Sequence, residues 1–427
     1  MIPSIAWKNI WRNRTRSLVV IVAIALGLFG GLFASAFLLG MSEQRVSEGI
    51  RYETPELKVQ HPRFKENLEP HYSITDVPDK ERALAKLPLV VGISPRVITS
   101  AMVQTATTSS GITLYGVDPA KEKTVSMLYQ TIWDSTAVRK NRPSVTNVAQ
   151  FVEDSCGVYL SDGQHIPIVI GEKLAHKLKV KVRSKLVITM QDYNGTLTGG
   201  AFRVVGIFRT SNTQFEENNA FVLRSDLSSL MVLPDSTVSE LALRLANEKQ
   251  LNVAAQQVRS LFPGLKVYTW RDSDPLLGMI DGMMLISLIS FMVIILLALG
   301  FVIVNTMLMV ILERVRELGM LMAVGMSKGR VFSMIMFETV LLTLTGGVVG
   351  IALGYGMVLL TSHSGIDLSS FSQGLRAIGY SPVVYPHIDI FFLLLVTALV
   401  LTTGLVASIF PAIRALKLRP VEALRQD

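Results

Sequence analysis

The stretch ERVRELGMLMAVGMSKGR, residues 313–330, lies between two of the longest uncharged apolar runs in the chain. Val315, Leu318 and Leu321 recur at the spacing of one helical face, and charged residues stand at the head of the stretch. Gly325 is placed where a helix would end, and Lys328 follows it as an anchor at the membrane surface. The pattern therefore predicts a short helix held between two membrane spans.

Four apolar runs are long enough to cross a bilayer, and we place transmembrane helices at 18–40, 278–312, 331–361 and 388–412. As a helix, the uncharged part of the first run would be about 33 Å long, against a hydrocarbon core of about 30 Å. Roughly a third of the second run would extend beyond the lipid. A cleaved signal peptide is the rival interpretation of the first run, but its apolar character continues past Ala34-Ser35-Ala36 to Leu39.

Basic side chains gather next to these spans, so the net charge of +8 does not by itself indicate a nucleic-acid partner. Four basic residues and no acidic one precede the first span, and residues 313–330 and the C-terminal end are also basic. The loop between the third and fourth spans contains a single lysine or arginine, Arg376. By the positive-inside rule, both termini and residues 313–330 face the cytoplasm, and residues 41–277 face the opposite side.

Residues 41–277 have the pattern of one mixed α/β domain. Polar residues 41–53 lack proline and can extend the first helix up to Pro55. The segment 127–156 has little periodicity and is expected to be a loose insertion. The single cysteine, Cys156, permits no disulfide within the chain, so this domain must be stabilised by its own core. Strands are expected at 57–60, 112–117, 166–170, 185–190, 202–208 and 220–223, with helices at 172–178 and 248–261.

The predicted fold class is a polytopic α-helical membrane protein with four transmembrane helices and a large mixed α/β extracytoplasmic domain between helices 1 and 2. The predicted parts, in chain order, are a cytoplasmic N-terminus at 1–17, a first span at 18–40, the extracytoplasmic domain at 41–277, a second span at 278–312, a cytoplasmic coupling helix at 313–330, a third span at 331–361, a short extracytoplasmic loop at 362–387, a fourth span at 388–412 and a cytoplasmic tail at 413–427.

Signatures of several kinds of chemistry are missing from the sequence. No GxxxxGK followed by Ser or Thr is present, so the chain does not bind ATP in the P-loop manner. No two of the six histidines are four residues apart, no cysteine cluster accompanies them, and no GxSxG motif occurs. Glu338, inside an apolar run, is expected to pair with a neighbouring base rather than to carry protons. We expect no catalytic residue, no metal and no cofactor in this chain.

Several blocks of sequence resemble the permease subunits of FtsX-like, MacB-like ABC transporters. They are the motifs at 313–319 and 323–328, Glu338, the glycines at 346–354, the opening AWKNIWRNRTRSL and the ending FPAIRALKLRPVEALR. Within the outer domain, ITLYGVDPAKE, IVIGEKLAHKL and FRVVGIFRT are most similar to blocks of the lipoprotein-releasing (LolC/LolE-type) permeases. The turn KVKVRSK after the second block departs from the glycine and aspartate common in those proteins.

This resemblance implies a permease subunit, not an enzyme, in the bacterial inner membrane, with both termini cytoplasmic and the large domain periplasmic. A separate ABC ATPase would bind ATP and Mg, and a second permease chain, identical or paralogous, would complete the assembly. Its implied work is mechanotransmission, with release of lipoproteins from the inner membrane and a periplasmic lipoprotein carrier as a further partner. MacB-like efflux and FtsX-like control of cell-wall enzymes are the alternatives within the family.

Three groups of residues are predicted to do this work. Contacts for ATPase coupling are expected from Glu313, Arg314, Arg316, Glu317, Leu318, Leu321, Met322, Ala323, Gly325, Met326 and Lys328. Close helix packing, inside the bundle or in a dimer, is expected at Gly27, Gly31, Gly346, Gly350 and Gly354. Contacts to an apolar substrate are expected from Phe37, Met41, Met279, Met283 and Met284, because methionine adapts to varied apolar ligands.

Two further classes of protein compete with a transporter subunit. A membrane-anchored receptor would use the spans only to hold the outer domain, and it has no use for a helix between two spans on the cytoplasmic side. An ion-coupled carrier would place carboxylates, basic groups or broken helices near the membrane midplane. The scarcity of charge inside the spans argues against this carrier.

Overall fold

The structure is a computed structural model that describes residues 12, 14–132, 157–161, 163 and 166–416. Predictions for most of 1–17, for 133–156 with Cys156, and for 417–427 lie outside the described residues. The chain divides into two compact units. The helical unit comprises Met1–Glu43, Gly282–Leu368 and Val383–Asp427, and the mixed α/β unit comprises Gln44–Asp281 and Ser369–Pro382.

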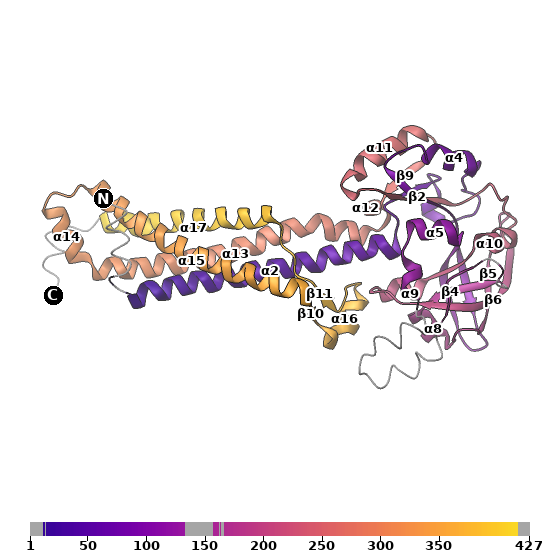
Figure 1. The fold of residues 1–427 in the computed structure, drawn as a ribbon, viewed down its shortest axis with the longest axis horizontal. Helices are drawn as coiled ribbons and strands as arrows, with labels where there is room; N and C mark the ends of the chain where they lie inside the picture. The colour runs from indigo at the N-terminus through magenta and orange to yellow at the C-terminus, as the bar shows by residue number, and fades with distance from the viewer. Residues whose placement is uncertain (1–11, 13, 133–156, 162, 164–165, 417–427) are drawn as a thin grey trace. The chain divides into compact units, whose positions relative to one another are not determined.

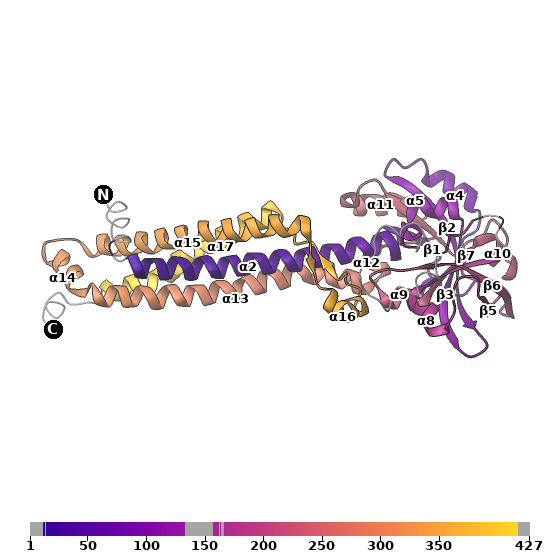
Figure 2. The same ribbon diagram turned by 60° about the horizontal axis from the view of Figure 1, so that its bottom comes forward.

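The helical unit is built from long apolar helices. They are α2 (Arg14–Glu48), α13 (Pro275–Glu313), α15 (Lys328–Ser364) and α17 (Ile390–Leu416). Each is long and apolar enough to cross a membrane. Figures 1 and 2 show them side by side, with the short helix α14 (Val315–Ala323) at one end. The prediction of four helices able to span a membrane is therefore confirmed.

Small residues let these helices pack closely. A Cβ atom built on Gly350 of α15 would lie 2.7 Å from the carbonyl oxygen of Ala25 in α2, a distance that real Cβ atoms do not adopt. Buried leucines, isoleucines, valines and methionines from all four helices fill the interior, among them Leu28, Ile303 and Val396. A short ribbon of β10 (Ile366–Asp367) and β11 (Val383–Val384) follows α15.

The mixed α/β unit is organised by one nine-stranded sheet in the described residues, with the order β3-β7-β4-β6-β5-β2-β8-β1-β9. Its strands are β1 (Leu57–Gln60), β2 (Val90–Gln104), β3 (Ser109–Val117), β4 (Pro167–Gly171), β5 (Lys185–Gln191), β6 (Leu197–Phe208), β7 (Asn219–Leu223), β8 (Glu240–Leu245) and β9 (Lys266–Thr269). The pairs β3–β7 and β4–β6 are parallel, and the other pairs are antiparallel.

Strand β2 belongs to two parts of this sheet. Its first half, from Val90 to Arg96, pairs with β8, whereas Val97 to Gln104 pair with β3 and the last four residues also pair with β5. The additional β2–β3 pairing closes β2, β3, β7, β4, β6 and β5 into a barrel. Closure leaves these strands without free edges.

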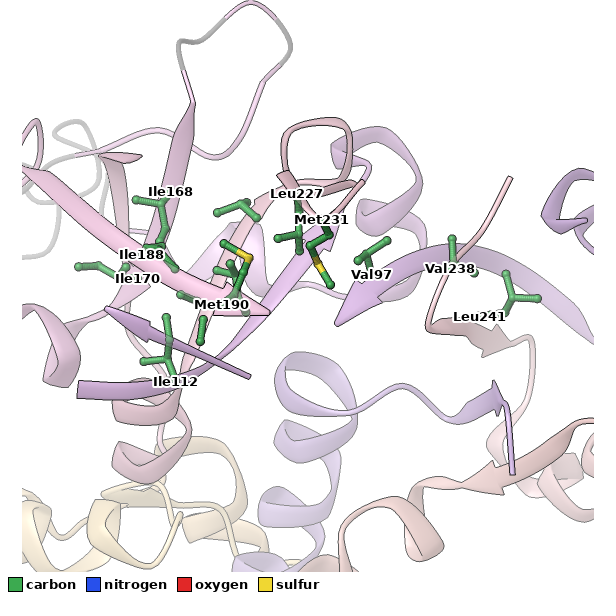
Figure 3. Packing of buried hydrophobic residues seen from close by; sticks show 14 of the residues in the cluster. Val97, Ile112, Ile168, Ile170, Ile188, Met190, Leu227, Met231, Val238 and Leu241 are labelled. Carbon is green, nitrogen blue, oxygen red and sulfur yellow. The ribbon is translucent and has the colours of Figure 1, made fainter. Parts of the chain in front are cut away.

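Alternating apolar residues fill the barrel and continue beneath the helices. Figure 3 shows part of this core, with Ile168, Ile188 and Met190 close together. The helices and helical turns of the mixed α/β unit are η1 (Gly49–Glu53), α3 (Phe64–Asn67), α4 (Val77–Leu84), α5 (Pro119–Val125), η2 (Leu128–Thr131), α8 (Glu172–Leu178), α9 (Thr213–Asn218), α10 (Arg224–Leu230), η3 (Glu248–Gln250), α11 (Leu251–Leu261), α12 (Trp270–Ser273), η4 (Ser369–Phe371) and α16 (Ser372–Ala377).

A buried polar cluster lies where β2 passes from one part of the sheet to the other. The Arg96 guanidinium donates to the Glu122 carboxylate at 2.6 and 3.0 Å and to Glu240 at 3.2 Å. Ser94 donates to Glu122 and Gln60 donates to Glu240, each at 2.7 Å. Because these buried charges are paired and hydrogen-bonded, they suit a structural role.

Candidate coupling site

Helix α14 is set off from its neighbours by two local features. Arg314, with φ of −102°, separates it from the end of α13 at Glu313. At its other end Gly325 has φ of +102°, which a residue without a Cβ adopts readily. The Gly325 N–H donates to the Met322 carbonyl at 3.1 Å, and the Met326 N–H donates to the Leu321 carbonyl at 3.0 Å. These two bonds form a Schellman motif that ends the helix.

Three ion pairs fix the beginning of α14. Arg314 donates to the Glu338 carboxylate of α15 at 3.1 Å and to Glu317 at 3.1 Å. Glu317 also accepts a hydrogen bond of 2.6 Å from Arg12. Glu338 is buried, and the sequence-based expectation that it pairs with a neighbouring base is confirmed, with Arg314 as that base. The pairs connect the chain before α2, the start of α14, and α15.

The charges around Glu317 keep it ionised. The hydrogen bond from Arg12 lowers the pKa of Glu317 below its usual range. Burial opposes this effect in part, and the hydrogen bond from Arg314 adds to the lowering. Glu317 and Arg12 are about half exposed. The Arg12–Glu317 contact is thus a solvent-screened pair, unlike the largely buried Arg314–Glu338 pair.

Helix α14 has one face in the core and another open. Val315 and Leu318 are buried, and Leu318 belongs to the core of the helical unit. On the open face, Val324 is 85% exposed and Met320 is 56% exposed, with Leu321 beside them at 37%. Exposed apolar side chains of this kind can be covered by another molecule. We call Met320, Leu321 and Val324 the α14 patch.

The structure thus divides the residues predicted for coupling. Arg314 and Glu317 form ion pairs, Leu318 packs in the core, and Met322 and Met326 are partly buried against that core. Glu313, Arg316, Leu321, Ala323, Gly325 and Lys328 are exposed. The sequence-based selection omitted Met320, Val324 and Arg12. Met320 and Val324 stand out from their neighbours only by their solvent exposure, which the sequence does not show. Arg12 was missed because it lies far from its partner Glu317 in the sequence.

The predicted packing glycines contact neighbouring helices within the chain. Gly346, Gly350 and Gly354 of α15 face α2, whereas Gly27 and Gly31 of α2 face Leu299 and Ile295 of α13. Their side-chain positions are occupied by other helices of the same chain.

The residues predicted to contact an apolar substrate differ in exposure. Met279 and Met283 are exposed, Phe37 and Met41 are half-buried, and Met284 packs against the helical core. A separate cavity of about 510 Å³, open on one side, lies between α13 and α17. It is lined by Val293, Leu296, Leu297, Gly300, Phe301, Val304, Leu399, Thr402, Thr403, Val406 and Ala407.

This cavity is almost entirely apolar in character. The hydroxyls of Thr402 and Thr403 each donate to the carbonyl of Leu399 at 2.8 Å, so their polar atoms are satisfied within α17. Gly300 lies on the α13 side opposite Thr403. The cavity therefore suits hydrocarbon better than a charged or strongly polar molecule.

Parts of both units match known sequence families. Residues 17–261 match the MacB-like periplasmic core domain, and residues 289–420 match the FtsX-like permease C-terminal domain. The chain belongs to the MacB/FtsX-like permease family. The α14 region lies within the match to the FtsX-like permease domain, and most of the sheet lies within the match to the MacB-like domain.

Curated relatives of this MacB/FtsX-like permease include proteins named macrolide export ATP-binding/permease protein MacB. The one from Neisseria gonorrhoeae is 25% identical over 232 residues, which cover 52% of this chain and 34% of the relative. The one from Agrobacterium fabrum is 24% identical over 432 residues, or 98% of this chain and 59% of the relative. The chain thus spans about a third of the length of the first relative and somewhat over half of the second.

A Bacillus subtilis relative, the uncharacterized ABC transporter permease YknZ, is 33% identical over 128 residues, which are 30% of this chain and 28% of that protein. Among solved structures, the periplasmic region of MacB from Actinobacillus actinomycetemcomitans is 11% identical, with a TM-score of 0.30, over 53% of this chain and 94% of that one.

Proposed function

We propose that this chain is the permease subunit of an ABC transporter and that a separate ATPase, which binds ATP and Mg, drives it. The observation that carries the proposal is α14, a short helix pinned to α15 through Arg314 and Glu338, with an apolar patch open to another molecule. The sequence contains no P-loop motif, so ATP binding is assigned to the partner. The family membership supports the same conclusion.

In this proposal α14 faces the cytoplasm and receives the force. The ATPase covers the α14 patch, and its closure on ATP moves α14. Arg314 passes this movement to α15 through its ion pair with Glu338, and to α13 because it directly follows the last residue of that helix. Helices α2 and α13 each run without a break from the helical unit into the mixed α/β unit, which supports mechanical transmission toward the periplasmic side.

We further propose that the cargo is acylated or otherwise apolar. The preferred hypothesis is release of lipoproteins from the inner membrane. The cavity between α13 and α17 supports an apolar cargo because its lining is hydrocarbon. Moving an acyl chain out of the bilayer costs about 0.8 kcal/mol per methylene, which gives a reason for coupling to ATP. Macrolide efflux is the second reading, since relatives carry that name.

The assembly proposed contains two permease chains and the ATPase, with a periplasmic lipoprotein carrier if the cargo is a lipoprotein. Both termini would lie in the cytoplasm. A membrane-anchored receptor would need none of these partners and gives no role to the α14 patch. The ion pair between Arg314 and Glu338 also leaves the buried carboxylate engaged, which disfavours an ion-coupled carrier.

The test is a tagged purification of the full chain from detergent-solubilised membranes, with co-purifying proteins and lipids identified by mass spectrometry. Recovery of a P-loop ATPase supports the permease, and enrichment of acylated proteins supports lipoprotein release. An ATPase without acylated proteins shifts the proposal to efflux or to control of cell-wall enzymes. Absence of any ATPase, under conditions that preserve other membrane complexes, would overturn the proposal in favour of the receptor.

A further inference from the structure

The segment 369–382 joins α15 to α17 in the sequence, yet it belongs to the mixed α/β unit. It contains η4 and α16, and α16 packs beside α9. Arg376, the one basic residue between the third and fourth spans, lies in α16. The position of this segment therefore depends on what its side chains contact in the mixed α/β unit.

Apolar burial contributes little to that position. Neither η4 nor α16 has a buried residue, and Phe371 and Ile378 are largely exposed. Gly379 is the buried residue of the segment, with φ of +83°, and a Cβ atom there would lie 2.5 Å from Nε of Arg45. Directional polar contacts, rather than a hydrophobic interface, must hold the segment.

Arg376 makes the central contacts. Its guanidinium donates to the Glu216 carboxylate at 2.9 Å and to the Thr210 carbonyl at 2.7 Å. Glu216 is 0% exposed, and the same carboxylate oxygen accepts a hydrogen bond of 2.6 Å from the Thr210 N–H. A second carboxylate, that of Glu172, lies 3.7 Å from Arg376.

A second ion pair lies under Gly379. Arg45 is 1% exposed and donates to Glu53 at 2.9 and 3.1 Å. Asn212 donates to the same Glu53 carboxylate at 2.9 Å, and its own side-chain oxygen caps α9. Because Asn212 is close in sequence to Thr210 and Glu216, the loop before α9 is fixed by both ion pairs.

We propose that Arg376 is a positioning residue that clasps the segment 369–382 to α9 through Glu216, and that this clasp opens or tightens when the partner ATPase binds and hydrolyses ATP. The ATP dependence of the clasp rests on the proposed function. A clasp made of a buried ion pair suits such a role because it fixes one geometry strongly and yet contributes little net stability compared with apolar contacts.

Hydrogen–deuterium exchange on the full chain in nanodiscs tests the clasp without any partner. In Arg376→Ala, amides of 369–382, such as the Tyr380 N–H that donates to Leu375, should exchange about tenfold faster or more. Peptides from β4 and β6 should exchange as in the wild type. Arg376→Lys, which keeps the charge but loses the planar fork, should give an intermediate rate.

Two further variants separate the clasp from general damage. Arg82→Ala removes an exposed arginine paired with Asp79 on the surface, so it should leave segment 369–382 unchanged. The double variant Arg376→Ala, Glu216→Gln removes both charges, so no ionised carboxylate is left buried without a partner. It should therefore free segment 369–382 even if Arg376→Ala alone disturbs α9. Unchanged exchange of 369–382 in this double variant would overturn the clasp.

The ATP-dependent change of the clasp is tested on the complex with its co-purified ATPase, trapped with Mg-ATP and orthovanadate. Exchange of 369–382 should differ severalfold between trapped and nucleotide-free wild-type complexes. Equal exchange in the two states would overturn the ATP-dependent change and leave a static clasp. Failure of any ATPase to co-purify would overturn the proposed function, whereas the result in nanodiscs would still decide the clasp.

Discussion

The Arg314 guanidinium at the start of α14 lies 3.1 Å from the Glu338 carboxylate of α15, and both side chains are largely withdrawn from solvent. The pair joins two helices that are separated in sequence by the whole of α14 and the turn after it. A displacement of α14 must therefore either move α15 or break this contact. In the proposed function, movement passes from α14 to α15 through this ion pair.

Removing one partner should be worse than removing both. Arg314→Ala leaves Glu338 buried without its base, so it should destabilise the helical unit by about 3–5 kcal/mol. Arg314→Ala combined with Glu338→Gln should recover part of that loss. Thermal unfolding of the purified chain in detergent measures both variants. Additive losses in the double variant would show that the two side chains do not interact.

The α14 patch should bind the ATPase without supporting the fold. Met320→Ser with Val324→Ser should leave thermal stability within about 0.5 kcal/mol of wild type, because both side chains are exposed, and should abolish co-purification of the ATPase. Leu318→Ser is the matched comparison. It changes a buried residue of the same helix and should lower stability first. Full ATPase recovery with the patch variant would remove the patch from the account.

The close approach of α2 and α15 should depend on Gly350. Gly350→Ala places a methyl group against the Ala25 backbone and should cost about 1–3 kcal/mol. Gly356→Ala is the control in the same helix, since a Cβ there meets nothing within 4 Å. It should be neutral or stabilising by up to about 1 kcal/mol. Equal thermal stabilities for the two variants would contradict the packing described.

The Arg12–Glu317 contact should depend on pH in a defined direction. The pKa of Glu317 is lowered in the folded chain from an ordinary value of 4.5, mainly by the Arg12 hydrogen bond. Its contribution is therefore present above about pH 4.5 and is lost as the pH falls through the lower folded value. Because both groups are half exposed, we expect an effect of about 1 kcal/mol or less that weakens further in salt.

Thermal unfolding of wild type and Glu317→Gln between pH 7 and pH 3 measures that contribution. The difference between the two proteins should be constant down to about pH 4.5 and should shrink progressively as the pH falls further. A difference that persists at pH 3 would assign the effect to something other than the charge of Glu317.

Much of the fold could be predicted because long apolar runs and alternating strands leave a direct mark on the sequence. The four spans and the strands at 57–60 and 185–190 follow from hydrophobic patterning alone. Strand β2 could not be found this way. Gly92, Pro95 and Arg96 interrupt its apolar pattern, because its two halves serve different parts of the sheet and Arg96 is buried by ion pairing.

The sites were harder to predict because they depend on contacts distant in sequence. Helical spacing identified α14 and its glycine stop, but only the fold distinguishes the buried Leu318 from the exposed Val324. Arg376 was visible as a lone base in a loop, while its partner Glu216 lies 160 residues away. The cavity between α13 and α17 likewise arises from two helices whose apolar residues look alike in sequence.

The most direct test of the central claim compares ATP hydrolysis by the partner ATPase alone with hydrolysis by the same ATPase bound to the full chain in nanodiscs. If force and signal pass through α14, binding of wild-type chain should change the turnover rate severalfold, and the Met320→Ser, Val324→Ser chain should leave it at the value of the free ATPase. An identical rate for the free ATPase and for the wild-type complex would contradict the account.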